Sequence, residues 1–249
     1  MSLRFIHTGD LHCNKERTPT VLKVLDKIKQ EASKVVDEKP YIDAICFCGD
    51  FWDSTITNTD ASGFTQILDA MYDLHEGFND IYMIYGTPSH ENAGSLRVFE
   101  KMGVKVLSAD TPYKPSVHVI DGDEPYEIVA IPEPRISLVE GKTLEEKYSA
   151  IQKSYRDLTL VPKTTEHRIV MFHGLVAGAL LDNCMGVPKG ETAIDKTILD
   201  SLEADVIMCA HIHRKQKVEG MSTPCFYCGS IPPKNFGETH ESSFNIIEV

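Results

Sequence analysis

The chain contains no long hydrophobic run. None of its apolar stretches approaches the length of about 20 residues that a membrane-spanning helix needs. The N-terminal stretch MSLRFIHTGD also lacks the apolar segment of a secretory signal peptide. These absences predict a cytoplasmic protein with no membrane contact. At 249 residues, of which 42% are hydrophobic, the chain is long and apolar enough to bury a core.

Cysteine is too scattered for a disulfide framework. The seven cysteines are an odd number, and most lie in apolar, strand-like runs such as AICFCGD and VIMCAH. This pattern favours reduced thiols in a core. Cys225 and Cys228 form a CxxC pair, but the pair lies inside a strand-like segment and has no second pair to complete a zinc site. We therefore expect core packing at these two thiols and no metal or redox chemistry.

Basic residues are in deficit. The chain has 25 lysines and arginines against 37 acidic residues, a formal net charge of −12 at pH 7. Nucleic-acid-binding proteins usually present a basic face, so this charge argues against a large non-specific contact unless basic residues cluster locally or bound metal offsets the acid. Two short clusters, NKER at 14–17 and HRKQK at 213–217, are candidates for a small contact, and each is equally consistent with ordinary solvated charge.

Strands and helices alternate along the chain. Strand-like runs at 3–10, 41–50 and 80–86 are separated by segments with helical periodicity at 18–38 and 62–78. Thr18 is expected as the N-cap of the first helix because Pro19 follows it. Later strands are expected at 105–108, 116–120, 126–132, 167–174, 204–211, 223–230 and 243–249, with helices near 94–103, 143–158 and 191–203. The pattern predicts a layered α/β fold, an α/β/β/α sandwich with two mixed sheets, as a single domain over 1–249.

Acidic residues and histidines collect where the strands end. The stretches TGDLH, CGDFWD, GTPSHE, VMFHG and MCAHIH each follow an apolar run. Functional residues of α/β sheets gather at the carboxyl ends of the strands, so these five ends are expected to converge. The residues that they deliver are Asp10, His12, Asp50, Asp53, His90, Glu91, His173, His211 and His213. DxH and HxH each put two side chains on one side of an extended segment, which lets both reach one ion.

This mixture of carboxylates and imidazoles suits manganese, iron or zinc better than magnesium or calcium, which prefer oxygen ligands alone. We therefore predict a metal site at the strand ends. The histidines outside the cluster are expected on the surface or in the core. They are His75, His118, His167 and His240. His7, in the first strand, either supports the site from behind or fills the core.

The motif order DxH, GDxxD, HE, HG and AHIH resembles that of the calcineurin-like metallophosphoesterases, whose pattern is DxH, GDxxD, GNHD or GNHE, HG and GHxH. More narrowly, FIHTGDLHCN and CFYCGSIPPKNFGETHESSFNIIEV resemble the nuclease subunit of the SbcCD complex of double-strand break repair. The resemblance implies a DNA exonuclease or endonuclease with two divalent metal ions, manganese first among them. It also implies a homodimer and a coiled-coil ATPase partner, although the capping and ATPase-binding segments of the longer nucleases are expected to be missing.

The resemblance assigns ligands to the two ions. Asp10, His12 and His213 would hold one ion, and His173 and His211 would hold the other. Asp50 would bridge the two, because a carboxylate offers two oxygens and its charge offsets two dications.

Three more roles follow from the resemblance. His90 would face the leaving oxygen and either donate a proton to it or stabilise its developing charge, and Glu91 would orient the His90 ring and favour its protonated form. Asp53 would orient a ligand without binding an ion itself, with a purely structural role as the alternative. The loop GTPSHE lacks the asparagine ligand of the family, and alignment on the HE pair places Ser89 there. Because a serine hydroxyl is shorter than an asparagine amide, the ion held by His173 and His211 is expected to be the weaker of the two.

The sequence thus predicts a metal-dependent phosphodiester hydrolase, with DNA as its substrate. Phosphodiester hydrolysis needs a nucleophile at neutral pH, charge neutralisation at the phosphate and a proton for the leaving group, and a pair of metal ions can supply the first two. Two alternatives stay open. The acidic charge favours a phosphatase or small-molecule phosphodiesterase, and the missing asparagine is consistent with a catalytically inactive scaffold of the same fold.

Overall fold

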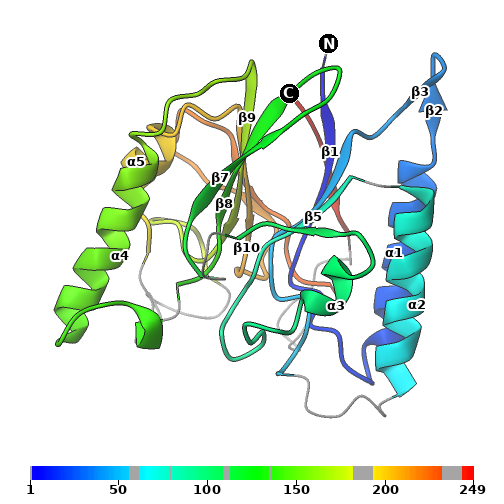
Figure 1. The fold of residues 1–249 in the computed structure, drawn as a ribbon, viewed down its shortest axis with the longest axis horizontal. Helices are drawn as coiled ribbons and strands as arrows, with labels where there is room; N and C mark the ends of the chain where they lie inside the picture. Colours follow the sequence, from blue (N-terminus) through cyan, green and yellow to red (C-terminus); the bar gives the residue numbers. More distant parts are fainter. Residues whose placement is uncertain are drawn as a thin grey trace.

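The computed structural model describes residues 2–55, 62–78, 80–108, 113–134, 136–181, 193–231 and 243–249. Two β-sheets lie face to face in the middle of the molecule, and helices cover the outer face of each sheet (Figure 1). This arrangement confirms the predicted α/β/β/α sandwich with two mixed sheets.

The first sheet has the strand order β13-β1-β4-β5-β6. Its strands are β1 (Arg4–Thr8), β4 (Ala44–Phe47), β5 (Ile81–Met83), β6 (Lys105–Val106) and β13 (Asn245–Glu248). The strands β1, β4, β5 and β6 run parallel, and β13 pairs antiparallel with β1. Because the parallel strands end at one edge, the loops that follow them lie together.

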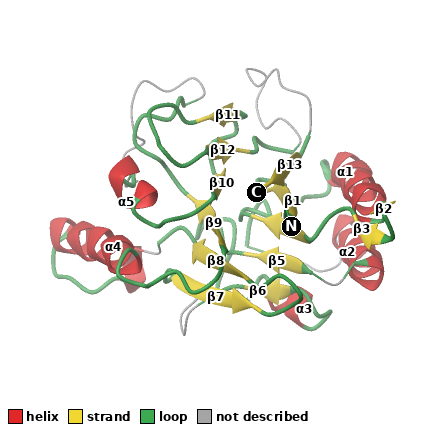
Figure 2. Ribbon diagram, turned by 90° about the horizontal axis from the view of Figure 1, so that it is seen from above, coloured by secondary structure: helices red, strands yellow, loops and turns green. Residues whose placement is uncertain are grey.

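The second sheet has the order β11-β12-β10-β9-β8-β7. Its strands are β7 (Ser116–Ile120), β8 (Tyr126–Ile131), β9 (His167–His173), β10 (Val206–Ala210), β11 (Gln216–Lys217) and β12 (Cys225–Tyr227). The four central strands are parallel, and the edge strands β7 and β11 are antiparallel to their neighbours. Figure 2, a view from above, shows the two sheets stacked face to face with helices on either side of them.

Hydrophobic side chains fill the three spaces between these four layers. Residues alternate along each strand, so in β1 Phe5 points between the sheets and Ile6 points toward the helices. Helices α1 (Thr18–Ala32) and α2 (Ser62–Gly77) cover the first sheet together with the short α3 (Arg97–Glu100). Helices α4 (Leu144–Leu158) and α5 (Lys196–Asp200) cover the second sheet, and a 3₁₀ turn (Ile136–Leu138) precedes α4.

The first helix differs from the prediction at both ends. It begins at Thr18, with Arg17 in the N-cap position, so Thr18 is not the cap. Arg17 makes no side-chain hydrogen bond to the first turn, and its own backbone N–H donates to Oδ1 of Asn14 at 2.9 Å. The helix ends at Ala32, six residues earlier than expected, with Ser33 as its C-cap.

A hairpin replaces the predicted last turns of this helix. Its strands are β2 (Val35–Val36) and β3 (Lys39–Pro40), which pair antiparallel. The two residues between them, Asp37 and Glu38, have φ values of 49° and 65°. Two consecutive positive φ values match the type I′ turn that closes two-residue hairpins.

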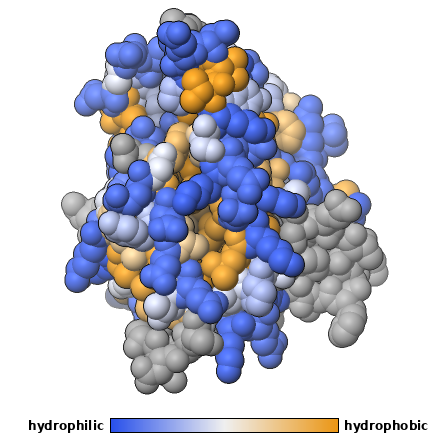
Figure 3. All heavy atoms as spheres, turned by 90° about the vertical axis from the view of Figure 1, so that its right-hand side faces the viewer, coloured by the Kyte–Doolittle hydropathy of each residue, from blue (hydrophilic) through white to orange (hydrophobic). Residues whose placement is uncertain are grey.

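The face formed by α1 and α2 is largely hydrophilic and carries scattered apolar patches (Figure 3). None of the helices in the described ranges is long and apolar enough to span a membrane. The cysteines of the described ranges are all buried with free thiols. Cys225, in β12, lies in the core beneath the helices of the second sheet, and Cys228, directly after that strand, lies in the core between the sheets, so both thiols pack in the core as the sequence predicts.

Candidate metal centre

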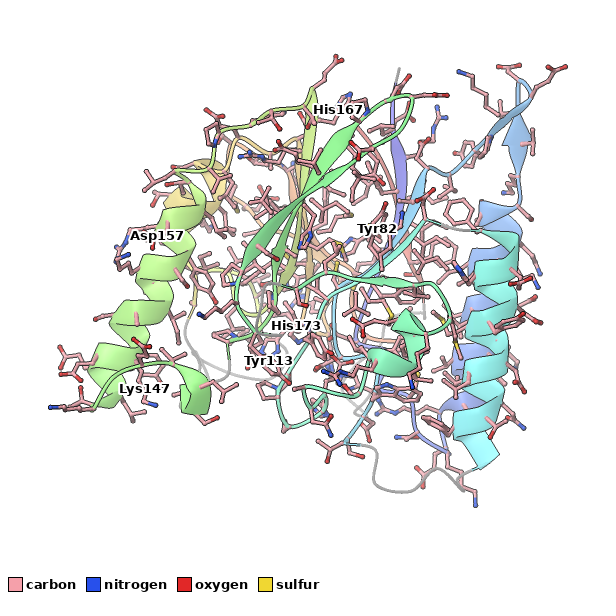
Figure 4. All side chains as sticks on the ribbon, in the orientation of Figure 1. Tyr82, Tyr113, Lys147, Asp157, His167 and His173 are labelled. Atoms are coloured by element: carbon pink, nitrogen blue, oxygen red, sulfur yellow. The ribbon has the colours of Figure 1, made fainter. Side chains whose placement is uncertain are left out.

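The strand ends predicted to carry the site do converge. Asp10 and His12 follow β1, Asp50 follows β4, and His90 lies in the loop after β5. His173 ends β9, and Figure 4 shows it near the middle of the molecule, at the opposite end of that strand from His167. His211 and His213 follow β10. Residues from both sheets therefore meet at one edge of the sandwich.

These side chains form groups that could hold a metal ion, with ligand atoms within 4.8 Å of one another in each group. The groups are Asp10, His12 and His213; Asp50, His173 and His211; and His12, Asp50 and His90. The first two correspond to the two ions that the family resemblance implies. Oδ2 of Asp50 lies 3.5 Å from Nε2 of His173 and 4.0 Å from Nε2 of His12, so Asp50 stands between the groups, where a bridging carboxylate belongs.

The backbone holds these loops in a costly conformation. The pairing of β1 with β4 continues past the strands, since the N–H groups of His12 and Cys13 donate to the carbonyls of Asp50 and Phe51. Four site residues have left-handed φ angles, which cost about 1–3 kcal/mol each outside glycine and cluster at functional sites. They are Asp10 at 50°, His12 at 45°, Asp50 at 49° and His211 at 95°.

Burial and neighbouring charges shift the pKa values of the site residues. Burial raises the pKa of the Asp10 carboxyl, although the nearby imidazoles oppose this effect. Burial also opposes ionisation of Asp50, yet the neighbouring His173, His12 and His90 hold the pKa of Asp50 far below its usual range. Conversely, burial would lower the pKa of His173, but the Asp50 charge raises it to about 10. A bound cation would stabilise these buried carboxylates. Because the ligands combine carboxylate oxygens with imidazole nitrogens, they fit manganese, iron or zinc.

The His173 imidazole is aimed by a backbone contact. Its Nδ1–H donates to the Cys48 carbonyl at 2.8 Å, which leaves Nε2 facing Asp50, where it can bind an ion once its proton is displaced. Asp10 is fixed in a similar way, because both of its carboxylate oxygens accept from the His211 backbone N–H, at 3.0 and 2.8 Å.

Glu91 does not orient His90, and that prediction is wrong. The buried Glu91 carboxylate accepts backbone hydrogen bonds from Phe51 at 2.8 Å and from Gly86 at 2.7 Å, so it ties two loops together. Burial and the charge of Asp50 raise the pKa of Glu91 to about 7. The His90 ring is held instead through Nδ1, which donates to the backbone carbonyl of Asp53. Its Nε2 then lies 4.0 Å from Oδ2 of Asp50, and the side chain is 21% exposed.

Asp53 thus contributes its carbonyl to His90, and its carboxylate serves another neighbour. Oδ1 of Asp53 lies 3.7 Å from Nδ1 of His12, and Oδ2 accepts from the Asn14 amide at 3.0 Å. This position beside His12 agrees with the predicted orienting role.

Thr87, and not Ser89, reaches into the site where the family pattern has asparagine. Ser89 is exposed. Oγ1 of Thr87 lies 3.0 Å from Oδ2 of Asp50 and 3.3 Å from Nε2 of His173. The reason is the packing of Gly86, since a Cβ at that residue would lie 2.9 Å from Cγ of Asp50. The close contact fixes the chain at Gly86, and the next residue, Thr87, enters the site.

Glu133 is a site residue that the sequence analysis missed. It follows β8, and its Oε2 lies 3.5 Å from Nδ1 of His211 and 3.8 Å from Nε2 of His173. A small cavity of about 30 Å³ adjoins it, lined also by His173, His211 and Tyr155. Such a volume holds about one water molecule and no organic group. The signal in the sequence was an acid after the apolar run YEIVAIP, a sixth strand end of the same kind.

The remaining histidines of the described ranges stand apart from this cluster. His7 is fully buried, and its Nε2 lies 3.0 Å from the Cys209 carbonyl, so it joins β1 to β10 in the core behind the site. Burial lowers the pKa of His7 to about 3, so this ring is neutral. His75, His118 and His167 lie outside the metal groups, and His240 falls outside the described residues.

Comparisons with known proteins agree with this geometry. A family profile described as "Calcineurin-like phosphoesterase" matches residues 3–215. A search of curated proteins finds no match. Among solved structures, the GAP50 anchor of the Plasmodium inner membrane complex is similar at 12% identity and a TM-score of 0.60, covering 99% of this chain and 81% of that one.

Two further structures share the fold. A putative 5′-nucleotidase from Staphylococcus aureus is similar at 14% identity and a TM-score of 0.52, over 92% of this chain and 49% of that chain. The protein TT1561 of Thermus thermophilus is similar at 10% identity and a TM-score of 0.50, over 100% of this chain and 99% of that one. At these identities the likeness establishes the fold alone.

Proposed function

Because the chain belongs to the calcineurin-like phosphoesterase family, we propose that it is a metal-dependent phosphodiester hydrolase that cleaves DNA. The observation that carries the proposal is the place of His90. Its Nε2 faces Asp50 beside both metal groups, and the side chain is partly open to solvent. A proton donor in that position can serve the oxygen that leaves when a phosphodiester bond breaks.

We assign the residues of the site to metal binding and to proton donation. Divalent ions, when bound, neutralise phosphate charge and lower the pKa of water. Asp10, His12 and His213 would hold one ion and His173 and His211 the other, with Asp50 between them. We propose manganese as the ion, with iron and zinc as alternatives. His90 would donate its Nε2 proton to the leaving oxygen while the Asp53 carbonyl holds Nδ1–H.

DNA is favoured as the substrate by the two basic clusters that stand out in the acidic sequence. They lie far apart in the chain, but His12 and His213, whose Nε2 atoms are 3.0 Å apart, bring them to the same edge of the molecule. Lys15 and Arg17 follow His12 closely, and Arg214 and Lys215 follow His213 directly. These cations are suited to phosphates on either side of the cleaved bond.

Three substrates test the proposal with the purified protein and added Mn²⁺: an aryl phosphodiester, an aryl phosphomonoester and end-labelled DNA. We expect cleavage of the diester and of DNA. Arg214→Ala should raise KM for DNA and leave kcat/KM for the aryl diester nearly unchanged, with the exposed Lys153→Ala as the matched control. Binding to duplex DNA should be weak and should fall with salt as expected for only a few phosphate contacts.

A small-molecule phosphoesterase is the second candidate, because the net charge of −12 disfavours a polyanion. Cleavage of the monoester alone would establish it and exclude the nuclease. Absence of turnover with manganese, iron and zinc would favour an inactive scaffold, and one structural neighbour is described as an anchor. The homodimer and the coiled-coil ATPase partner stay predictions from the family resemblance.

A further inference from the structure

We propose that Glu133 and Thr87 together replace the asparagine ligand of the family, so that the second ion position, at His173 and His211, is held by an additional carboxylate. The proposal rests on the metal dependence in the proposed function and is independent of the substrate. It gives Glu133 a role that neither the sequence motifs nor the comparisons assign.

The distances around this position are those of donor atoms that share one ion. Oε2 of Glu133 lies 3.0 Å from Oγ1 of Thr87, 3.5 Å from Nδ1 of His211 and 3.8 Å from Nε2 of His173. Oγ1 of Thr87 is in turn 3.0 Å from Oδ2 of Asp50. Neighbouring ligands at about 2.0–2.2 Å from an ion are separated by about 2.8–3.1 Å in octahedral geometry and by about 3.3–3.6 Å in tetrahedral geometry, so only the distance from Glu133 to His173 would have to shorten slightly when an ion binds.

Hydrogen bonding alone does not account for this arrangement. The Thr87 hydroxyl has one proton, and two carboxylate oxygens, Oδ2 of Asp50 and Oε2 of Glu133, each lie 3.0 Å from its oxygen. The proton can satisfy only one of them. The other oxygen depends on the positive charge of the neighbouring imidazoles when no ion is bound, and a divalent cation would supply that charge in their place.

The backbone around Glu133 is restricted, and its side chain is largely buried. This residue follows β8, the strand next to β9, and the side chain is only 18% exposed. Pro132 and Pro134 flank it, and proline restricts the backbone both at its own position and at the residue before it. Because this segment is already restricted, the Glu133 carboxylate would lose little conformational entropy when it binds the ion.

The exchange of a neutral amide for a carboxylate has a consequence for affinity. An extra negative charge strengthens the attraction for a dication, so the position at His173 and His211 should not be the weaker of the two. This expectation reverses the one drawn from Ser89, which is exposed and does not enter the site.

The test compares Mn²⁺ binding by wild-type protein, Glu133→Gln and Thr87→Val, without any substrate. Calorimetry and the EPR spectrum of bound Mn²⁺ give the number of ions and their separate affinities. We expect two ions in the wild type and a loss of at least about tenfold in affinity for one ion in Glu133→Gln, with a smaller loss in Thr87→Val. Glu140→Gln, an exposed change of the same charge, should bind both ions as the wild type does.

The stability of the metal-free protein separates a ligand from a structural residue. Glu133→Gln removes a charge next to Asp50, so its melting temperature without metal should equal or exceed that of the wild type. A lowered metal-free melting temperature with unchanged ion affinities would make Glu133 structural and overturn the proposal. Binding of a single ion by the wild type would overturn it too. Failure to cleave DNA would remove the proposed substrate and leave this inference standing.

Discussion

The Nε2 atoms of His12 and His213 lie 3.0 Å apart, although 201 positions separate the two residues in the sequence. Each ring comes from a different sheet, since His12 follows β1 and His213 follows β10. Two imidazole nitrogens at this distance repel when both rings are protonated, and a shared ion removes the repulsion. The contact therefore couples metal binding to the packing of the two sheets.

This coupling predicts stabilisation by metal. An ion that binds only the folded chain, at a free concentration of a hundred times its Kd, adds about 2.7 kcal/mol, which in a chain of this size corresponds to about 5–10 °C in melting temperature. Mn²⁺ should raise the melting temperature by that amount, and EDTA should reverse the shift. A potassium chloride control at equal ionic strength should not produce it. An unchanged melting temperature in saturating Mn²⁺ would contradict the coupling.

Asp50 and Asp53 offer a matched pair of substitutions on one loop. Asp50→Ala should abolish binding of both ions, because the carboxylate stands between the two groups. Asp53→Ala should keep both ions and lower activity modestly, because its carboxylate touches His12 from outside the metal groups. Elemental analysis of the purified variants measures the difference. Equal metal content in wild type and Asp50→Ala would show that this residue does not bridge.

His90 should matter for turnover and not for metal. His90→Ala should lose about a hundred- to ten-thousand-fold in kcat, the usual contribution of a general acid, while both ions stay bound. The comparison is best made with two diesters whose leaving groups differ in pKa. A leaving group that needs no proton should be nearly insensitive to the substitution. Loss of metal together with activity would show that His90 is a ligand.

The sequence revealed most of this site because its signals are local. Each ligand motif directly follows an apolar run, and parallel strands bring such ends together without further information. The two cores beside β1 also follow from a local signal. Side chains alternate between the two faces of a strand, so Phe5 lies on one side of β1 and Ile6 on the other.

The errors come from contacts between distant segments. Ser89 aligned with the family asparagine by counting back from His90, but the backbone is fixed at Gly86 by its contact with Asp50, 36 residues earlier in the chain. The Asp53 carbonyl that holds His90 is a backbone group with no sequence signature. The hairpin after α1 was missed because Asp-Glu carries none of the asparagine-glycine signal that marks a type I′ turn.

The packing of Gly86 against Asp50 leads to a fourth prediction. Gly86→Ala would put a Cβ 2.9 Å from Cγ of Asp50 and closer still to the Asp50 backbone nitrogen, so the backbone at Asp50 or at residue 86 must move together with the bridging carboxylate. We expect weaker binding of both ions and a large loss of activity. Gly77→Ala, at the end of α2 with no atom within 4 Å of its added Cβ, is the matched control and should behave as wild type. Normal metal content in Gly86→Ala would mean that the loop adapts and that the glycine does not set the site.

A buried ion pair away from the metal centre should be costly to break from one side. Nε of Arg168 donates to Oε2 of Glu127 at 2.6 Å, and both side chains are 1% exposed. Arg168 also donates to the Val161 and Leu202 carbonyls, which fixes the chain on both sides of β9. Breaking such a pair from one side leaves a buried charge without its counter-ion, which costs about 3–5 kcal/mol, and here the hydrogen bonds from Thr164 to Oε1 of Glu127 would remain.

Arg168→Met should therefore lower the free energy of unfolding by about 3–5 kcal/mol in urea titrations. The exposed pair between Lys153 and Asp157 on α4, at 2.7 Å, provides the comparison. Lys153→Met should change stability by about 0.5 kcal/mol or less, because water already solvates both charges. Adding Glu127→Leu to Arg168→Met should recover part of the loss, since the uncompensated carboxylate is then gone. A double variant no more stable than Arg168→Met would show that the cost lies in the lost contacts to Val161 and Leu202 and not in the stranded charge.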